Sequence, residues 1–283
     1  MPELPSELER DIFELAFESS NRDLTFKLTL CLVARRVHLW IDQLFYRMLS
    51  LADNQRATRF LRVIQANLKP AGFFAAVKNL CLTYYVMGTT ACQILAACTD
   101  VESLACWIDS EDTPQLPLLI GRLPLRRLSI EADHFSRIPV TPSTWLSSLT
   151  HIELVPWGKN DYLASTLSRL AHLPCLTHVS LGAAHMNGEL VGLVCSSCPH
   201  LQVLLLRSSS DDREFSDEDS IPNLYRKLNL QESAHDYRII MQRDPKGFDH
   251  VENWEAAYFA RSDMWSHAEV TMEEQKALSI RNV

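Results

Sequence analysis

Apolar residues between positions 77 and 206 recur in a short pattern with the spacing L-x-x-L-x-L. The pattern occurs six times, and its central apolar residues are Leu80, Leu104, Leu128, Ile152, Val179 and Leu204. Successive central residues lie 24, 24, 24, 27 and 25 positions apart. Because apolar and other residues alternate within each unit, each unit predicts a short β-strand with one buried face.

The segments between these units have helical patterns, as in residues 91–97, 162–170 and 189–195. A single strand–helix unit cannot bury its own apolar face, so the units must stack and share a core. We therefore expect an α/β fold, a curved solenoid of about six to seven strand–helix repeats. The last of these would include a strand at Arg238–Gln242.

The repeat resembles the leucine-rich repeat over roughly residues 70–207. The stretch Leu193–Leu201 (LVCSSCPHL) is similar to the cysteine-containing subtype of that family. The family's Asn or Cys, three residues after the last repeat leucine, is missing. The residues at that position are Tyr85, Asp109, Asp133, Trp157, Ala184 and Ser209. Since that Asn forms an internal hydrogen-bond ladder in the family, we expect the solenoid to be irregular.

The first 50 residues predict helices. Pro5 and the acidic residues after it suit the start of a helix, and Leu8, Ile12 and Leu15 lie on one helical face. A second helical pattern of apolar residues runs from about Leu28 to Leu51.

This N-terminal segment resembles the F-box, a three-helix module. The matching stretches are residues 4–13 (LPSELERDIF) and, more loosely, residues 32–40 (LVARRVHLW), in which Val37 replaces a common aromatic residue. An F-box followed by leucine-rich repeats is a recurrent pairing in eukaryotes, and the chain is similar to fungal F-box proteins.

The resemblance implies that these helices dock onto the Skp-type adaptor of a cullin–RING ubiquitin ligase. The docking residues would be Leu4, Pro5, Leu8, Ile12 and Phe13, which would fill an apolar groove. In the alternative, the helices only cap the first repeat. Burial of Leu8 and Ile12 against that repeat would favour capping, whereas an exposed apolar face would favour docking.

Strand residues that flank the buried apolar positions point to the opposite side of the sheet, which we call the inner face. We expect this face to be concave and to bind a protein substrate. The predicted substrate-binding residues are Trp107, Arg127, Glu131, His151, Glu153, His178 and Arg207. Mixed charge beside aromatic groups suits a protein more than a nucleic acid or a lipid. The alternative is a solvated sheet face without a specific ligand.

The C-terminal part of the chain changes character, because only Leu278 among the leucines lies after residue 230. Residues 208–222 are rich in Ser and acids and are expected to form a flexible loop. Aromatic residues at 248–259 and 264–272 predict two helices that cap the solenoid, with Ser262 or Asp263 at the start of the second. The predicted organisation is an F-box-like module (1–50), a linking helix (51–76), repeats (77–207), the acidic loop (208–222), and a last repeat with the cap (223–283).

Composition and charge narrow the function classes. With only 8 glycines, the chain contains no glycine-rich phosphate loop and no nucleophile elbow. A net charge of −8 does not suit a nucleic-acid partner. We expect no metal or cofactor, because Cys195 and Cys198 lack a second pair of ligands. With no signal peptide, no apolar run of membrane-spanning length and eight reduced cysteines, a cytoplasmic or nuclear protein is expected.

These features predict a non-enzymatic substrate-recognition subunit of an SCF-type ubiquitin ligase. Its partners would be a Skp-type adaptor and a protein substrate, without nucleic acid or membrane. The alternative is a leucine-rich-repeat interaction scaffold with no link to a ubiquitin ligase.

Overall fold

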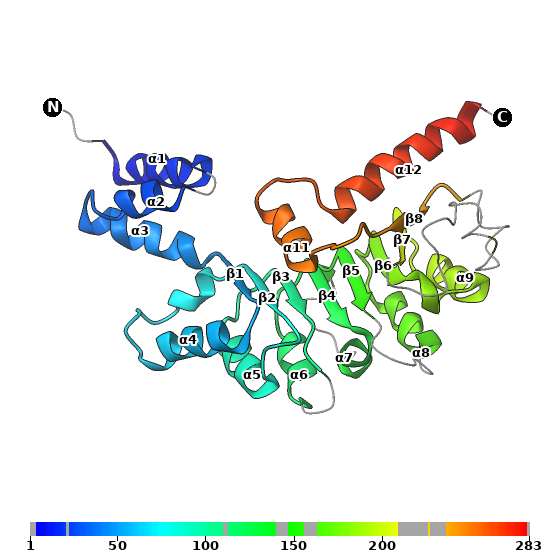
Figure 1. Cartoon of the computed structure of the whole chain (residues 1–283), viewed down its shortest axis with the longest axis horizontal. Helices are drawn as coiled ribbons and strands as arrows, with labels where there is room; N and C mark the ends of the chain where they lie inside the picture. The colour runs from blue at the N-terminus through cyan, green and yellow to red at the C-terminus, as the bar shows by residue number, and fades with distance from the viewer. Residues whose placement is uncertain are drawn as a thin grey trace.

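The fold is built on one open sheet of eight parallel strands, arranged in the order of the chain (Figure 1). The computed structural model describes residues 4–20, 23–109, 113–139, 147–155, 163–208, 226 and 236–281. The strands are β1 (Met48–Leu51), β2 (Asn79–Leu82), β3 (Ser103–Cys106), β4 (Arg127–Glu131), β5 (His151–Val155), β6 (His178–Gly182), β7 (Val203–Ser208) and β8 (Ile239–Arg243).

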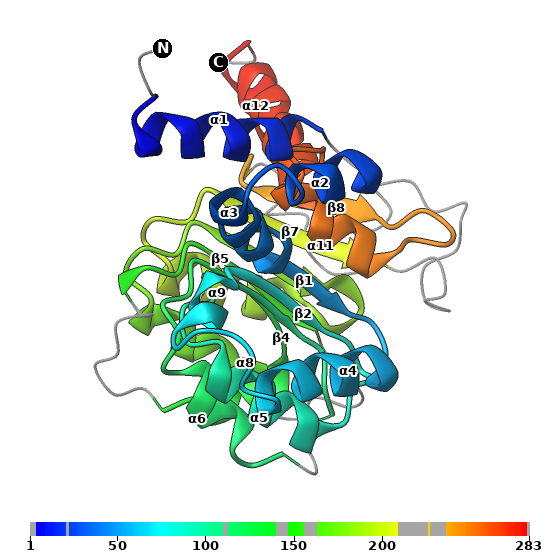
Figure 2. The ribbon, with the colours of Figure 1, turned by 90° about the vertical axis from the view of Figure 1, so that its left-hand side faces the viewer.

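Helical crossovers cover one side of this sheet, as parallel strands require (Figures 1 and 2). They are α4 (Asn54–Gln65), η1 (Phe73–Ala76), α5 (Gly88–Ala97), α6 (Leu116–Ile120), α7 (Ala132–Arg137), α8 (Leu163–Ser168), η3 (Arg169–His172), η4 (Ala183–His185) and α9 (Gly188–Ser197). The α/β class predicted from the repeat pattern is therefore confirmed.

The periodic apolar residues form the core between the sheet and these helices. The six central residues of the pattern pair in register from Leu80 through to Leu204, and all are buried. A single apolar cluster extends from Leu51 at the end of β1 to Met241 in β8. Every repeat thus buries its apolar positions against its neighbours, which explains the regular spacing along the chain.

The predicted helix from Leu28 to Leu51 is wrong. The structure has α2 (Leu24–Leu30), α3 (Arg35–Tyr46) and then strand β1. The extended backbone of Ala34 separates the two helices. Strand β1 pairs Leu49 with Leu80. Its alternating Leu-Ser-Leu pattern is too short to be distinguished from the apolar helical pattern that directly precedes it.

The N-terminal helices form a small core of their own. Helix α1 (Ser6–Ser19) packs on α2 and α3. The buried residues of this core are Phe17, Leu30, Val37, Ile41 and Leu44, and none of them belongs to the main cluster. These helices lie beyond the β1 edge of the sheet (Figures 1 and 2).

The predicted seventh repeat strand is confirmed as β8, one residue later than expected. Two helices follow it, α11 (His250–Tyr258) and α12 (Met264–Arg281). They do not cap the end of the sheet, and that expectation is wrong. Both helices lie over the inner face, where α11 contacts β1, and α12 contacts β7 and β8 (Figure 1). Of the predicted acidic loop, only Ser208 falls within the described residues.

Among the described residues, no helix has both the length and the apolar character needed to cross a membrane.

Substitution of one repeat leucine tests the shared core. We expect Leu104→Ala to lower the free energy of unfolding by about 2–5 kcal/mol, because Leu104 is completely buried and the change leaves a cavity. The control Leu118→Ala removes the same atoms from an exposed position on α6 and should cost about 0.5 kcal/mol or less. Urea denaturation measures both, and equal losses would contradict the assignment of the core.

Candidate functional site: the inner face and the N-terminal helices

The strand residues that flank the buried apolar positions form rows across the inner face. One row is Asn79, Ser103, Arg127, His151, His178 and Val203, and these residues are paired across β2 to β7. The next row is Cys81, Ala105, Ser129, Glu153, Ser180 and Leu205, also in register. Six of the seven predicted substrate-binding residues lie on strands of the sheet, and the seventh, Trp107, directly follows β3.

The inner face is covered, however, so most of these side chains are not accessible to a substrate. Buried residues on it are Trp107, Glu131, Glu153, His178 and Arg207, whereas Arg127 and His151 are half-buried. The cover is the C-terminal segment, which we define as residues 244–281. Whether these side chains bind a substrate stays a prediction, which requires the C-terminal segment to move.

Two small apolar clusters hold the C-terminal segment on the sheet. On one side, Val251 and Trp254 of α11 pack against Trp107 and its neighbours on β2 and β3. On the other, Trp265 and Ala268 of α12 pack in a cluster with inner-face residues of β7 and β8. Because both faces of the sheet are covered, its strands are apolar on both sides near β7 and β8.

A buried charge network centres on Arg207, at the end of β7. Its guanidinium donates to Asp244, from Nε at 3.1 Å and from Nη2 at 2.7 Å, and also donates to Glu153. Ser129 donates to Glu153 at 2.6 Å and accepts from the Trp107 indole N–H at 2.7 Å. Burial alone would lower the pKa of Arg207, but the carboxylates of Glu153 and Asp244 outweigh it and raise that pKa. The guanidinium is therefore charged and fully paired.

Arg207 also contacts the C-terminal segment directly. Its guanidinium carbon lies 4.7 Å from the centroid of the Phe248 ring, and its Nη1 lies 3.4 Å from the Met264 sulfur. One buried cation therefore joins β5 and β7 to the chain before α11 and to the start of α12.

A second ion pair fixes the start of α12. Arg127 of β4 donates to Asp263 at 2.9 Å. Asp263 also accepts from the backbone N–H of Ser266 at 2.9 Å, so it caps α12, one of the two predicted alternatives. Burial would raise the pKa of Asp263, but its bonds to Ser266 and Arg127 hold that pKa below its usual value.

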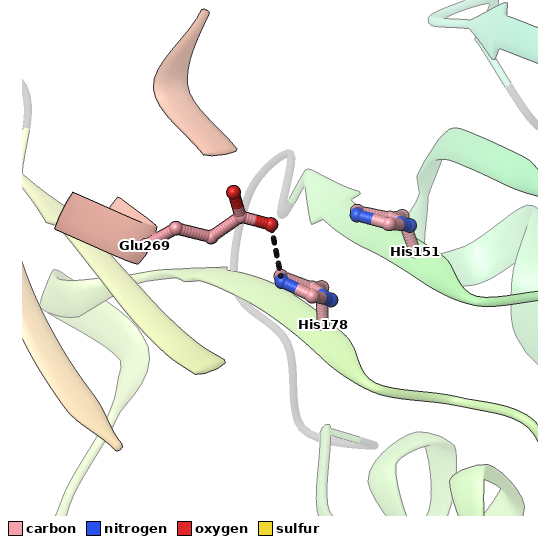
Figure 3. Close-up of side chains that lie close together, drawn as sticks. All are labelled: His151, His178 and Glu269. Carbon is pink, nitrogen blue, oxygen red and sulfur yellow. Dashed lines mark ion pairs between the residues drawn. The ribbon is translucent and has the colours of Figure 1, made fainter. Parts of the chain in front are cut away.

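Two histidines stack beside this ion pair. The rings of His151 and His178 are 4.1 Å apart and nearly parallel, and both meet the Trp265 ring edge-on at 5.3 and 5.7 Å. Burial lowers the pKa of His151 to about 3, and it lowers that of His178 more than the nearby Glu269 carboxylate raises it. Figure 3 shows Glu269 reaching from α12 towards this pair.

Glu131 lies near a fully buried histidine at the end of β4. Its Oε2 is 3.9 Å from Nε2 of His134, which is also 2.9 Å from the carbonyl oxygen of Ile108. The contact between His134 and Ile108 joins α7 to the loop after β3, so His134 has a structural role.

Open space remains beside the cover. A groove of about 810 Å³ separates α1–α3 from α11, and its walls include Phe17, Met48, Trp254, Tyr258 and Phe259. A second groove of about 600 Å³ follows the start of α12, past His151 and Glu269.

The residues predicted to dock an adaptor do not share one environment. Leu4, Pro5, Leu8 and Ile12 are exposed on or just before α1. Phe13 is half-buried and packs into the small core of α1–α3, so its side chain faces the other way.

No family model matches the chain. No curated protein matches it either.

Several residues of the site were not predicted. Asp244, Phe248 and Glu269 reach the inner face only because the chain turns back over the sheet, which no local pattern encodes. His151 and His178 were predicted, and their equivalent positions are visible in the sequence, because Leu-Thr-His occurs at residues 149–151 and again at 176–178.

The weak cysteine pattern near α9 does not form a cluster. Cys198 is buried in the main core, where burial raises its thiol pKa to about 11, and Cys195 packs against the edge of that core. His200 is exposed. Within the ranges that the structure describes, these three side chains do not form a metal-ligand group.

Removal of the central cation tests the network. We expect Arg207→Ala to cost about 3–5 kcal/mol of unfolding free energy, because it leaves the Glu153 and Asp244 carboxylates buried without a counter-charge. Arg126→Ala, which changes an exposed arginine outside the network, should cost less than about 1 kcal/mol. Urea denaturation of both variants is the measurement, and a small loss for Arg207→Ala would show that the network is solvated.

The histidine environment predicts a pH dependence. A folded-state pKa near 3 for His151, against about 6.5 in the unfolded chain, means that the unfolded state takes up a proton first as the pH falls. Stability from this group is complete above about pH 6.5 and falls by about 1.4 kcal/mol per pH unit below it.

We therefore expect the unfolding free energy of His151→Gln to depend less steeply on pH between 6.5 and 4.5 than that of the wild type. The neighbours His178, Arg127 and Asp263 are present in both proteins, so their own contributions largely cancel in the comparison. Identical slopes would mean that His151 titrates normally in the folded protein.

Proposed function

We propose that this protein is a non-enzymatic substrate-recognition subunit of an SCF-type cullin–RING ubiquitin ligase. In this proposal α1–α3 dock onto a Skp-type adaptor, and the rest of the chain presents a protein substrate. The observation that carries the proposal is the apolar surface that α1–α3 leave uncovered.

On α1 this surface consists of residues at helical spacing. Leu8, Ile12 and Leu15 are 52%, 55% and 63% exposed, while Phe17 on the other side of the helix is buried. Capping would have buried Leu8 and Ile12 against the first repeat. Their exposure therefore favours docking, because a contiguous apolar patch on a surface marks an interaction site.

Further apolar residues are exposed on α2 and α3. Leu28 is exposed on α2, Leu39 on α3, and Leu32 and Val33 in the turn between these helices; Leu32 is 84% exposed. Leu32, Val33 and Leu39 belong to the second stretch that resembles the F-box. An amphipathic helix of this kind lays its apolar face into a hydrophobic groove of a partner protein.

The substrate surface in this proposal is the groove of about 810 Å³ between α1–α3 and α11. It is lined by aromatic side chains and by the charged residues Glu18, Lys27, Arg47 and Arg127, a mixture typical of protein interfaces. It replaces the covered inner face as the surface accessible to a substrate. The proposed compartment is the cytoplasm or the nucleus, where such ligases act.

Co-purification with a recombinant Skp-type adaptor tests the proposal. We expect the full chain to capture the adaptor, and the double variant Leu8→Asp, Ile12→Asp to lose at least about tenfold in affinity, since two apolar anchors become charged. The matched control, Leu118→Asp with Val270→Asp, changes two equally exposed apolar residues elsewhere and should bind as the wild type does.

Circular dichroism checks that each variant is folded. Failure of the wild-type chain to bind would reject the adaptor role and favour an interaction scaffold. Equal binding by the Leu8 and Ile12 variant would show that a different face docks.

A further inference from the structure

We propose that His151, His178 and Glu269 form a binding site for one divalent metal ion of the zinc type, which fastens α12 to the sheet. The site joins β5, β6 and α12, as Figure 3 shows. This inference stands on these three side chains and does not depend on the ligase proposal.

A threonine hydroxyl beside each histidine ring indicates the tautomer of both histidines. The hydroxyl of Thr150 donates to the Arg126 carbonyl oxygen at 3.1 Å and lies 2.8 Å from Nδ1 of His151. A hydroxyl has one proton to donate, so with that proton on the carbonyl oxygen Nδ1 is the donor, and the neutral ring carries its lone pair on Nε2.

The same arrangement occurs one repeat later. The hydroxyl of Thr177 donates to the Thr150 carbonyl oxygen at 3.1 Å and lies 2.8 Å from Nδ1 of His178. Such a hydrogen bond to the distal nitrogen is the usual support of a metal-binding histidine. The repeated Leu-Thr-His sequence therefore builds two matched ligands on adjacent strands.

One atom of the site is buried and unsatisfied. His178 has a side chain that is only 5% exposed, and its Nε2 has no hydrogen-bond partner in the structure. Oε1 of Glu269 lies 3.1 Å away, but not in hydrogen-bond alignment. A lone pair on Nε2 facing a carboxylate oxygen is repulsive, and a cation between the two atoms, either a proton or a metal ion, removes that repulsion.

A metal ion supplies that cation. The ligand atoms of the three residues all lie within 4.8 Å of one another. Two imidazoles and one carboxylate bind zinc at about 2.0–2.2 Å and leave a fourth position for water. Glu269 is 52% exposed and borders the groove of about 600 Å³, which gives the ion a path from solvent.

The surrounding charges agree with a bound cation. The nearby positive group is Arg127 of β4, and its charge is paired with Asp263 at the start of α12. Glu269 thus supplies the negative charge that the two neutral histidines lack. Because the two rings are stacked nearly parallel, convergence of both Nε2 atoms on one ion requires one ring to tilt towards the other.

Metal binding to the full-length protein tests the site. After treatment with a chelator, the protein is titrated with Zn²⁺ by calorimetry and with Co²⁺ by visible absorption. We expect one ion per chain, a rise in Tm with Zn²⁺, and cobalt bands without thiolate charge transfer. Binding should weaken at least about tenfold in Glu269→Gln and in His178→Asn.

Glu274→Gln and His200→Asn are the matched controls, because both change exposed residues outside the site and should bind as the wild type does. Glu269 is exposed on α12, so Glu269→Gln keeps the test valid if His178→Asn fails to fold. The proposal is overturned by no binding to the wild type, by unchanged binding to Glu269→Gln, or by a thiolate signal that places the ion on cysteines.

Discussion

The buried charge of Arg207 is the constraint on which the arrangement of the sheet and the C-terminal segment depends. A guanidinium taken out of water costs several kcal/mol unless carboxylates surround it. Glu153 supplies one carboxylate from β5, but Asp244 comes from the chain after β8. The chain must therefore return over the inner face as soon as β8 ends, and the positions of α11 and α12 follow from that return.

The two sides of the sheet are consequently different kinds of core. On the outer side, one apolar cluster spans the repeats from β1 to β8, and each leucine is held by its neighbours above and below. On the inner side, two small apolar clusters are separated by ion pairs, histidines and hydroxyls. Fewer apolar contacts hold the C-terminal segment than hold the repeats, so this segment belongs to the low-stability part of the molecule.

The sequence pattern predicted the repeats because each strand depends on its own alternation and on identical neighbours. Six of the eight strands and their register could be placed from spacing alone, and β8 was placed to within one residue. Strand β1 was missed because Leu49 follows an apolar helical run. The inner-face residues were assigned to the right rows, yet their burial was not foreseen, since Trp254 and Trp265 reach them through tertiary contacts that no local pattern records.

The candidate metal site depends both on the local repeat pattern and on tertiary contacts. Its ligand geometry comes from the repeat, which places Thr150 and Thr177 at equivalent positions, but Glu269 belongs to α12. A ligand shifts an equilibrium only as far as it binds one state better than the other. An ion that needs all three side chains binds only when α12 covers the sheet, so its binding free energy would add directly to the contacts that keep the inner face closed.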